Sequence, residues 1–335
     1  MLWPCASLPN ADLKGRTTLR VGGPVEWLLE PANPDELRKA IVAAREAGFV
    51  PRLLGGGANV VIDDVGLPGV VIATDRLNRV FRPPSGPSLD GAPTGADAGA
   101  AALLDELLPS SQMAPPDPSW DPRLIAWAGA PLPKLCRAAR DLGYSGLEKM
   151  AGVPGHLGGG IAMNAGGKSP DGTLWQMSDV VDMIRVVGAD GQFQDILRAD
   201  WAPEYRDGRL GDGIVVGAVL SFEPRPKAQV IEDSKEYLRR KNAVQPVTEW
   251  SAGCVFKNPD PELSGGKTAG LLVDEAGGKG RRHGGAEISE RHGNFLVNRG
   301  EATAADVFGL IEEIQALVAE KAGVVLEPEV KIWRS

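Results

Sequence analysis

The chain has 335 residues and a formal net charge of −8, with an isoelectric point near 5.1. This length exceeds one ordinary domain, so we expect two or three domains of roughly 100–150 residues each. The acidic balance argues against a nucleic-acid partner, because phosphate backbones are bound by basic faces, although a few well-placed cations in a cleft could still bind a nucleotide sugar.

The cysteines and histidines exclude other classes. Cys5, Cys136 and Cys254 are an odd number at wide spacing, which gives neither a disulfide framework nor a zinc ligand set. The histidines have no clustered ligand spacing, so we expect no metal site. The N-terminus lacks the basic region of a signal peptide, and no stretch approaches the ~18 apolar residues of a membrane span. We therefore expect a cytoplasmic protein with no membrane partner.

The first part of the chain is predicted to begin as a β-α-β unit. A strand over residues 25–29 precedes Asn33-Pro34-Asp35-Glu36, which supplies a cap, a first-turn proline and two early acids for an amphipathic helix. A strand over 51–54 then leads into Gly55-Gly56-Gly57-Ala58-Asn59, before another strand over 60–62. Glycines between two strands allow backbone amides to approach a ligand without a Cβ in the way.

Residues 82–122 interrupt this pattern. They are rich in Pro, Gly, Ala, Ser and Asp around one short helical patch at 100–108, so we expect a mobile surface insertion that buries little apolar surface. Regular elements resume with a strand over 124–130 and a helix over 131–142, which Gly143 ends.

A second glycine-dense region follows at residues 152–167. It is predicted to form a turn and a short helix that starts near Leu157, with amides that can face an anion. Asp190-Gly191 then predicts a hairpin turn between strands over 183–187 and 193–196. A long apolar strand is expected over 214–222.

The C-terminal part is predicted to begin at Pro224-Arg225-Pro226. It carries helices over 230–241, 270–276 and 302–322 and a closing strand over 324–333.

The common nucleotide-binding motifs are incomplete in this sequence. The loop at Gly55 lacks the last glycine of GxGxxG and precedes a strand, and Gly266-Lys267-Thr268 matches only half of a P-loop.

One reactive side chain lies in the stretch Trp250-Ser251-Ala252-Gly253-Cys254-Val255-Phe256-Lys257-Asn258-Pro259. A thiol held among small residues, with a cation and an amide behind it, can give or accept a proton at a fixed place. The alternative is a buried structural cysteine in a turn rich in glycine and proline.

This stretch resembles the Ser-Ala-Gly-Ser/Cys-x-Phe-Lys-Asn-Pro signature of the UDP-N-acetylenolpyruvoylglucosamine reductases, flavoenzymes that complete UDP-N-acetylmuramate for bacterial cell walls. Three further motifs look like that family's FAD-contacting segments and occur in its order: residues 18–24, 54–60 and 152–166. A single glycine loop is more often a turn than a ligand site. The resemblance implies a non-covalent FAD, and the residues it assigns to cofactor binding are Arg20, Gly22, Leu54, Gly55, Gly56, Gly57, Ala58, Asn59, Val60, Gly129, Gly152, Val153, Pro154, Gly155, His156, Gly158, Gly159, Ala162 and Asn164.

The resemblance also implies three catalytic residues. Glu204-Tyr205-Arg206-Asp207 is similar to the family's Tyr-Arg-x-Ser motif, so Arg206 would bind the enolpyruvyl carboxylate and stabilise the negative charge that develops there. The segment Leu326-Glu327-Pro328-Glu329-Val330 resembles the Leu-x-x-Glu-Val motif, which assigns the catalytic glutamate to Glu329. Glu327 is a weaker candidate on the same face of the expected strand. Considered singly, an arginine or glutamate is more often a surface ion.

In the mechanism that the resemblance implies, NADPH reduces FAD, and flavin N5 delivers hydride to C3 of the enolpyruvyl sugar. The third catalytic residue, Cys254, then protonates the resulting enolate at C2. The substrate, UDP-N-acetylglucosamine enolpyruvate, would be oriented by residues near the thiol and the arginine, namely Tyr205, Lys257, Asn258 and His292.

The resemblance covers nearly the whole chain outside residues 82–122 and implies an α+β fold. We expect two FAD-binding subdomains of the vanillyl-alcohol-oxidase/PCMH type, over 1–76 and 77–223, and a C-terminal α+β substrate-binding domain over 224–323. The closing segment 324–335 should return to the first subdomain, and the protein should be a monomer. The chain resembles the shorter subtype, because it lacks room for an added tyrosine-bearing loop between Phe222 and Cys254.

Two positions depart from the family pattern. His156 stands where Ser or Thr is usual beside the pyrophosphate, and Gly208 replaces the usual serine after Tyr205-Arg206-Asp207. Two alternatives stay open: a flavin-dependent oxidase on the same scaffold, which would consume oxygen, and a flavin-binding protein that has lost catalysis.

Overall fold

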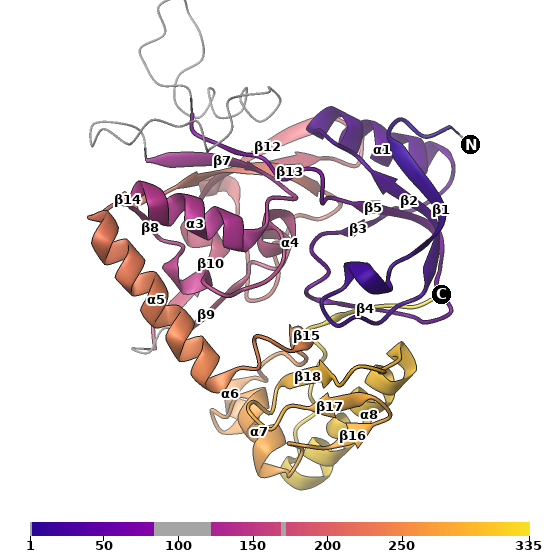
Figure 1. Cartoon of the computed structure of the whole chain (residues 1–335), viewed down its shortest axis with the longest axis vertical. Coiled ribbons are helices and arrows are strands. Elements are labelled where there is room, and N and C mark those ends of the chain that lie inside the picture. Colours follow the sequence, from indigo (N-terminus) through magenta and orange to yellow (C-terminus); the bar gives the residue numbers. More distant parts are fainter. Residues whose placement is uncertain (1, 84–121, 169–171) are drawn as a thin grey trace, which may run out of the picture. The chain divides into compact units, whose positions relative to one another are not determined.

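The structure is a computed structural model that describes residues 2–83, 122–168 and 172–335 (Figure 1). The predicted insertion over 82–122 lies almost wholly outside the described residues, as does the short helix expected at 100–108. The chain divides into two compact units. Unit 1 comprises Met1–Ser7, Leu29–Gly56 and Val70–Arg239, and unit 2 comprises Leu8–Leu28, Gly57–Gly69 and Arg240–Ser335. The division into three domains stays a prediction.

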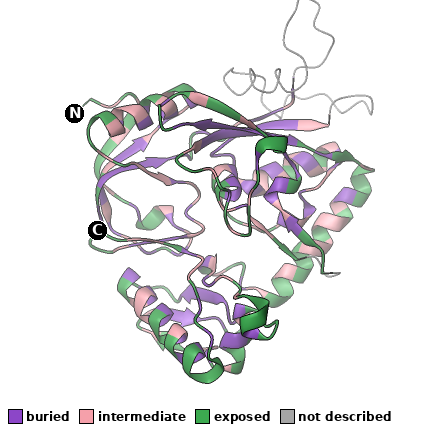
Figure 2. Ribbon diagram, turned by 180° about the vertical axis from the view of Figure 1, so that it is seen from behind, coloured by how far each residue is buried: buried purple, intermediate pink, exposed green. Residues whose placement is uncertain are grey.

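Unit 1 contains a five-stranded sheet in which all pairs are antiparallel. Its order is β12-β11-β13-β7-β6, with the bounds Phe193–Leu197, Val181–Val187, Ile214–Ser221, Arg123–Trp127 and Val80–Phe81. Helices α3 (Leu132–Leu142) and α4 (Leu157–Ala162) contribute apolar side chains to the core that this sheet forms. The sheet is largely buried, as Figure 2 shows.

The strand, helix and strand predicted for the first part of the chain are confirmed. Helix α1 (Pro34–Glu46) begins at the Asn33 cap, whose Oδ1 accepts a hydrogen bond from the Glu36 N–H at 2.9 Å. Strand β3 (Arg52–Leu54) pairs in parallel with β5 (Leu67–Ala73), so that Leu54 lies opposite Ala73. Strands β1 (Ala6–Asp12), β2 (Pro24–Glu30) and β5 each have residues in both units.

Short strand pairs and one long helix complete the part before residue 245. The pairs are β8 (Tyr144–Ser145) with β14 (Glu223–Pro224), and β9 (Gly166–Lys168) with β10 (Leu174–Gln176). Helix α5 (Lys227–Val244) buries only Val230, so it presents mostly exposed and half-buried residues (Figure 2). Among the described helices, none has the length and apolar character needed to cross a membrane.

Unit 2 is built on the four-stranded sheet β15-β18-β17-β16. These strands are Trp250–Cys254, Phe295–Asn298, Ala286–Ile288 and Arg282–His283. Helix α8 (Ala304–Ala322) starts at a capping box of Thr303 and Asp306 and ends at Gly323, and it packs its apolar face into the core. Two shorter helices, α6 (Pro261–Ser264) and α7 (Ala269–Glu275), precede the sheet's middle strands.

The closing strand is shorter than predicted. Strand β19 covers only Lys331–Trp333 and pairs in parallel with β4 (Val60–Ile62). The preceding residues make an isolated bridge between Phe256 and Pro328. Pro328 has no backbone N–H to donate to a ladder, so the regular strand begins only beyond it.

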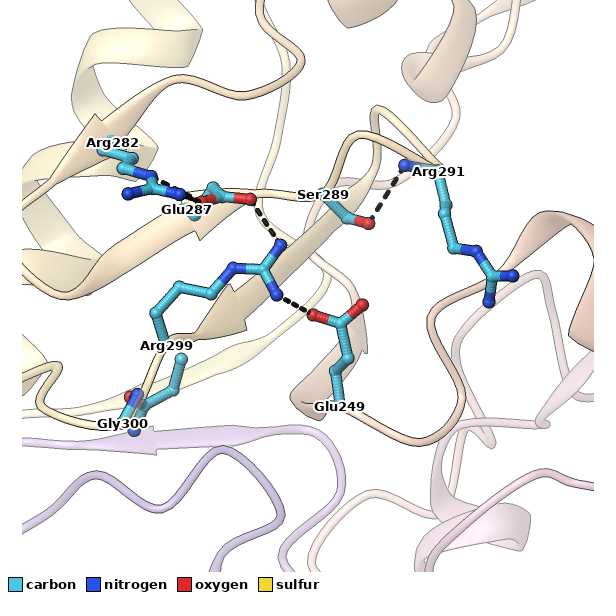
Figure 3. A network of polar contacts seen from close by, with 8 residues as sticks. Glu249, Arg282, Glu287, Ser289, Arg291, Arg299 and Gly300 are labelled. Atoms are coloured by element: carbon cyan, nitrogen blue, oxygen red, sulfur yellow. Dashed lines mark hydrogen bonds and ion pairs between the residues drawn. The ribbon is translucent and has the colours of Figure 1, made fainter.

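A buried carboxylate in β17 of the unit 2 sheet binds one arginine in β16 and another directly after β18 (Figure 3). The Glu287 side chain is only 3% exposed and forms ion pairs with Arg282 and Arg299. Arg299 also pairs with Glu249, the residue before β15. The hydrogen bond from Arg299 is the main reason that the pKa of Glu287 lies below its usual value, and Arg282 adds to this effect. The network therefore ties the start of β15 to β17 through ionised groups.

We predict that Glu287→Gln lowers the free energy of unfolding by about 1–3 kcal/mol at neutral pH, because the amide cannot satisfy two guanidinium groups. The pKa of Glu287 is depressed in the folded state, so its stabilisation is complete above the unfolded pKa and is lost as the pH falls through the folded pKa. Urea unfolding of both proteins between about pH 7 and about pH 3 should show the gap closing. Glu320→Gln, at an exposed ion pair, is the control, and equal stability of wild type and Glu287→Gln at neutral pH would contradict the prediction.

Candidate functional site

The two glycine-rich segments of the sequence meet within unit 1. Gly55 and Gly56 follow β3, and Gly155 precedes α4. A Cβ on Gly56 would lie 2.9 Å from the Gly155 Cα, a distance that real Cβ atoms essentially never show. Only glycine therefore allows these two backbones to lie so close. The structure brings together residues 54–60 and 152–166, two of the three segments that were predicted to contact FAD.

Gly129 and Gly158 continue this close packing at the end of β7. A Cβ on Gly129 would lie 1.7 Å from the Thr74 carbonyl oxygen, directly after β5. The Gly158 N–H donates to the Ala128 carbonyl at 2.7 Å, which joins α4 to the end of β7. Glycine backbone at the ends of β3 and β7 and around the start of α4 thus lies close to neighbouring main chain, including the Thr74 carbonyl after β5.

His156 lies between these segments. A Cβ on Gly55 would be 3.6 Å from the His156 Cβ, so the side chain packs directly on the first glycine loop. His156 is the N-cap residue of α4, but its side chain does not cap the helix. Its Nδ1 lies 3.3 Å from Thr74 Oγ1, and its Nε2 lies 4.0 Å from a carboxylate oxygen of Asp75. The imidazole thus lies against the first glycine loop, close to both Thr74 and Asp75.

Burial disfavours the charged form of His156. It lowers the pKa of the imidazole below its ordinary value, and the nearby Asp75 carboxylate opposes this effect without cancelling it. A bound anion next to the ring would raise that pKa again, because it would favour the charged form.

Asn164, also predicted to contact the cofactor, is directed into unit 1. The residue is 1% exposed. Its Nδ2 donates to the Gln176 side chain and to the Glu204 carbonyl, and its Oδ1 accepts from the Ser178 N–H. Its φ is +39°, which asparagine tolerates better than most residues. These contacts give Asn164 a role in holding the segment that carries Arg206. The neighbouring Gly159 and Ala162 are exposed on α4, and Gly152, Val153 and Pro154 lie in the turn before it.

Arg206 occupies the tip of a tight turn in unit 1. Glu204 and Asp207 exchange two backbone hydrogen bonds, at 2.8 and 3.2 Å, and leave Tyr205 and Arg206 as the two central residues. Arg206 has φ of +59°, an uncommon conformation for a residue with a side chain. Its guanidinium carbon lies 5.0 Å from the centre of the Tyr205 ring, within the range of a cation–π contact. The two predicted side chains therefore lie together.

Gly208 has a packing reason to be glycine. A Cβ at this position would lie 2.4 Å from the Ile161 carbonyl oxygen of α4, and the Gly208 N–H donates to the Ala162 carbonyl at 2.9 Å. The absence of the family's serine therefore fits the close contact between this turn and α4, and the turn is held by backbone hydrogen bonds instead.

In unit 2, the Arg20–Gly22 segment lies beside the end of the first glycine loop. The Thr18 N–H donates to the Gly57 carbonyl at 3.0 Å, and the Thr18 hydroxyl donates to the Ser251 carbonyl at 2.6 Å. Arg20 has φ of +58°. On the other side of the loop, Asn59 Nδ2 donates to the Glu329 carbonyl at 3.3 Å, next to Ala58 and the start of β4 at Val60. Hydrogen bonds within unit 2 thus join four segments of the chain: residues 18–22, residues 57–60, Ser251 and Glu329.

Cys254 and Glu329 lie on adjacent segments of unit 2. Cys254 ends β15 opposite Phe295, and the Val255 carbonyl that follows it accepts from the Glu329 N–H at 2.7 Å. Both side chains belong to half-buried residues. The structure therefore brings together two of the three predicted catalytic residues, whereas Arg206 belongs to unit 1.

Glu327 differs from Glu329. The two glutamates were expected to share one face of a strand, but the regular strand starts only at Lys331, after both of them. Glu327 is exposed and its carboxylate lies 3.4 Å from the Lys257 amine, a surface ion pair. Two contacts with Glu327 thus hold Lys257. One is this ion pair, and the other is a hydrogen bond from the Lys257 N–H to the Glu327 carbonyl.

The remaining substrate candidates in unit 2 have structural contacts. Asn258 Oδ1 accepts from the Ala269 N–H at 3.0 Å, at the start of α7. His292 Nδ1 accepts from the Asn294 N–H at 3.1 Å, and its ring packs on Phe295 with centroids 5.0 Å apart. Burial lowers the pKa of His292, and Lys279 adds to this shift.

Three polar residues at these sites were not named individually from the sequence, although the first lies in the predicted segment 18–24: Thr18, Thr74 and Asn294. Each acts through a contact with a segment far away along the chain, so local pattern gives no signal for it. The family resemblance, which covers nearly the whole chain outside residues 82–122, includes Asn294 but gave it no role. In the part of the chain that the structure describes, no group of three or more His, Cys, Asp or Glu residues could hold a metal ion.

Comparisons with known proteins agree along the whole chain. The family model described as UDP-N-acetylenolpyruvoylglucosamine reductase, C-terminal domain, matches residues 245–333. A reductase of that name from Synechococcus sp. (strain JA-3-3Ab) is 37% identical over 98% of this chain and 91% of its own length. One from Moorella thermoacetica is 34% identical over 97% and 93%.

A solved structure gives the same result for the fold. The crystal structure of UDP-N-acetylenolpyruvylglucosamine reductase from Thermus caldophilus has a TM-score of 0.71 and 31% identity, and the match covers 98% of both chains. The predicted α+β fold is therefore confirmed.

We predict that His156 gives the apoprotein a pH-dependent stability. Its pKa is lower in the folded than in the unfolded chain, so the unfolded state binds the proton more readily. Stability should rise with pH from the folded pKa up to the unfolded value of about 6.5 and fall on acidification. Thermal unfolding across this range should show a shallower slope for His156→Gln, although His292 contributes in the same direction.

Asp75→Asn provides the opposite control. Its carboxylate raises the His156 pKa, so its removal should lower that pKa further and extend the dependence to more acidic pH. Identical slopes in wild type, His156→Gln and Asp75→Asn would contradict this account.

Proposed function

The chain belongs to the UDP-N-acetylenolpyruvoylglucosamine reductase family, and we propose that it uses FAD and NADPH to reduce UDP-N-acetylglucosamine enolpyruvate to UDP-N-acetylmuramate, a precursor of peptidoglycan. The observation that carries this proposal is the contact between the segments of Cys254 and Glu329. These residues are far apart in the sequence, yet the Glu329 N–H donates to the carbonyl of the residue after Cys254. The two segments that resemble the family's catalytic motifs are thus adjacent, which supports the proposal.

The glycine segments fit a dinucleotide such as FAD. Gly56 meets Gly155, and Gly129 meets Thr74, at distances that no Cβ would allow. Backbone of this kind can approach a diphosphate closely and bind it through N–H groups. When bound, FAD would accept a hydride from NADPH and supply it to C3 of the enolpyruvyl group.

Arg206 would bind the carboxylate of the enolpyruvyl group. A guanidinium is always charged and can make two parallel hydrogen bonds to a carboxylate, so it would favour the negative charge that develops during reduction. The strained turn and the Tyr205 ring restrict where the guanidinium can lie. That restriction supports a role at a defined position, since an arginine with φ of +59° is uncommon.

Cys254 would protonate C2. An ordinary thiol has a pKa near ~8.5, far below that of an alcohol, so at neutral pH it is mostly protonated and can still release its proton readily. The proton passes from Sγ to the carbanionic C2, and the thiolate must later regain a proton from solvent. Glu329, on the neighbouring segment, would act beside Cys254 in this step.

Lys257, Asn258, Tyr205 and His292 would orient the substrate. Lys257 supplies a cation three residues after Cys254, which suits a phosphate-bearing sugar. The contact of Asn258 Oδ1 with Ala269 fixes the amide orientation, so its Nδ2 would be the group offered to the substrate.

The proposal predicts a yellow protein that contains one non-covalent FAD. Acid precipitation should release the flavin, because no covalent link is expected. Under anaerobic conditions, absorbance should show flavin reduction by NADPH and reoxidation when the enolpyruvyl sugar is added. Reduction without reoxidation would favour a protein that has lost catalysis, and oxygen consumption with another substrate would favour an oxidase.

We predict that Cys254→Ala slows substrate turnover by ~10²–10⁴-fold, as expected for the loss of a general acid. Flavin reduction by NADPH should be unchanged, because the thiol takes no part in it. Cys254→Ser should retain appreciable turnover and serves as the conservative control. Near-wild-type turnover of the alanine variant would leave Cys254 with a packing role only.

A further inference from the structure

The segment that carries Cys254 leaves the sheet through a one-residue bulge. Ser251 pairs with Val297 and Cys254 pairs with Phe295, so three steps along β15 match two along β18. Gly253, within the bulge, has φ of +80°, where a side chain would be strained. Because residues 295 and 297 share a face, the bulge places Cys254 on the face of Ser251, and a regular strand would place it on the opposite face.

Asn294 holds the two residues that follow the cysteine. Asn294 is 4% exposed, and its side-chain Oδ1 accepts from the Phe256 N–H at 2.9 Å while Nδ2 donates to the Phe256 carbonyl at 2.8 Å. Its main-chain carbonyl accepts from the Val255 N–H at 2.9 Å. The side-chain amide therefore reproduces the pair of hydrogen bonds that an antiparallel strand would make with Phe256.

We propose that Asn294 is a positioning residue for Cys254: by fixing the backbone of Phe256, it holds the thiol where the proton transfer takes place. The catalytic consequence rests on the proposed reductase function, whereas the hold on the thiol does not. The other side of this segment is fixed by the hydrogen bond from Glu329 to Val255. Loss of the Asn294 side chain removes two hydrogen bonds to the Phe256 main chain, whereas the main-chain hydrogen bonds of Val255 to Asn294 and Glu329 remain.

Two variants separate the contacts. Asn294→Ala removes both side-chain hydrogen bonds. Asn294→Asp has almost the same size and retains an oxygen that can accept from the Phe256 N–H, but it loses the donor to the Phe256 carbonyl. Both variants should therefore loosen the segment, the alanine variant by removing both contacts and the aspartate variant by placing a carboxylate oxygen against the Phe256 carbonyl.

Thiol reactivity tests the hold directly. Alkylation of purified protein by iodoacetamide, followed for each cysteine by peptide mass spectrometry across a pH series, reports Cys254 against Cys5 and Cys136, which both belong to unit 1. In Asn294→Ala the Cys254 rate should rise roughly tenfold, since a loosened segment exposes the thiol more often, while the two reference rates stay constant. A wild-type Cys254 rate in both variants overturns the proposal. If all three rates rise in the alanine variant, that protein has unfolded and the aspartate variant decides.

Glu287→Gln is the matched control. Glu287 is a buried polar residue of the same sheet whose side chain binds Arg282 and Arg299, and it is linked to β15 only indirectly, through the ion pair of Arg299 with Glu249. Its substitution should leave Cys254 alkylation unchanged. An equal rise in that variant would show that any loss of sheet stability exposes the thiol, which also overturns the proposal.

A double-mutant cycle tests the catalytic consequence. Asn294→Ala should lower turnover with the enolpyruvyl sugar roughly 10–100-fold, as small displacements of a reacting group do, and leave flavin reduction by NADPH unchanged. In a Cys254→Ala background the same change should cause no further loss, because no thiol is left to position. A full further loss in that background contradicts the proposal. If wild type itself shows no turnover, the reductase function fails, and the alkylation rates still decide the role of Asn294.

Discussion

The backbone of Val255 and Phe256 is the constraint on which the proposed catalytic part of unit 2 depends. Asn294 binds it from one side, and Glu329 binds it from the other. Cys254 directly precedes this backbone, and Glu329 itself makes one of the hydrogen bonds. The two side chains are therefore placed by the same main-chain contacts, so a change that moves one segment also moves the other. Sites held in this way keep their geometry better than sites on unsupported loops.

Unit 1 relies on a different constraint, the close approach of backbones. Gly56 lies against Gly155, Gly129 against Thr74, and Gly208 against Ile161, each at a distance that no Cβ would permit. Glycine is thus required by packing at these positions before any ligand is considered. The same lack of side chains exposes main-chain groups to a ligand, so one property serves both the fold and the proposed cofactor site.

Local signals in the sequence predicted the elements they control. The Asn33 cap fixed the start of α1, and Gly143 fixed the end of α3, because both act within a few residues. The bulge at Gly253 was missed because it depends on the partner strand. The late start of β19 was also missed, although Pro328 is a local signal against a strand at that position. Asn294 gave no local signal at all, because its side chain binds a residue 38 positions away. The roles of the site residues came only from family resemblance, which pattern and spacing could not supply.

The discontinuous make-up of unit 2 has a consequence for how the chain folds during synthesis. Thr18 binds Ser251, 233 residues further on, and the core joins Leu19, Val21 and Val61 to apolar residues of α8. These early apolar side chains cannot be buried in that core until the ribosome has made the C-terminal part. Contacts between such distant segments form slowly, so the N-terminal segments stay open to chaperones and to aggregation throughout translation.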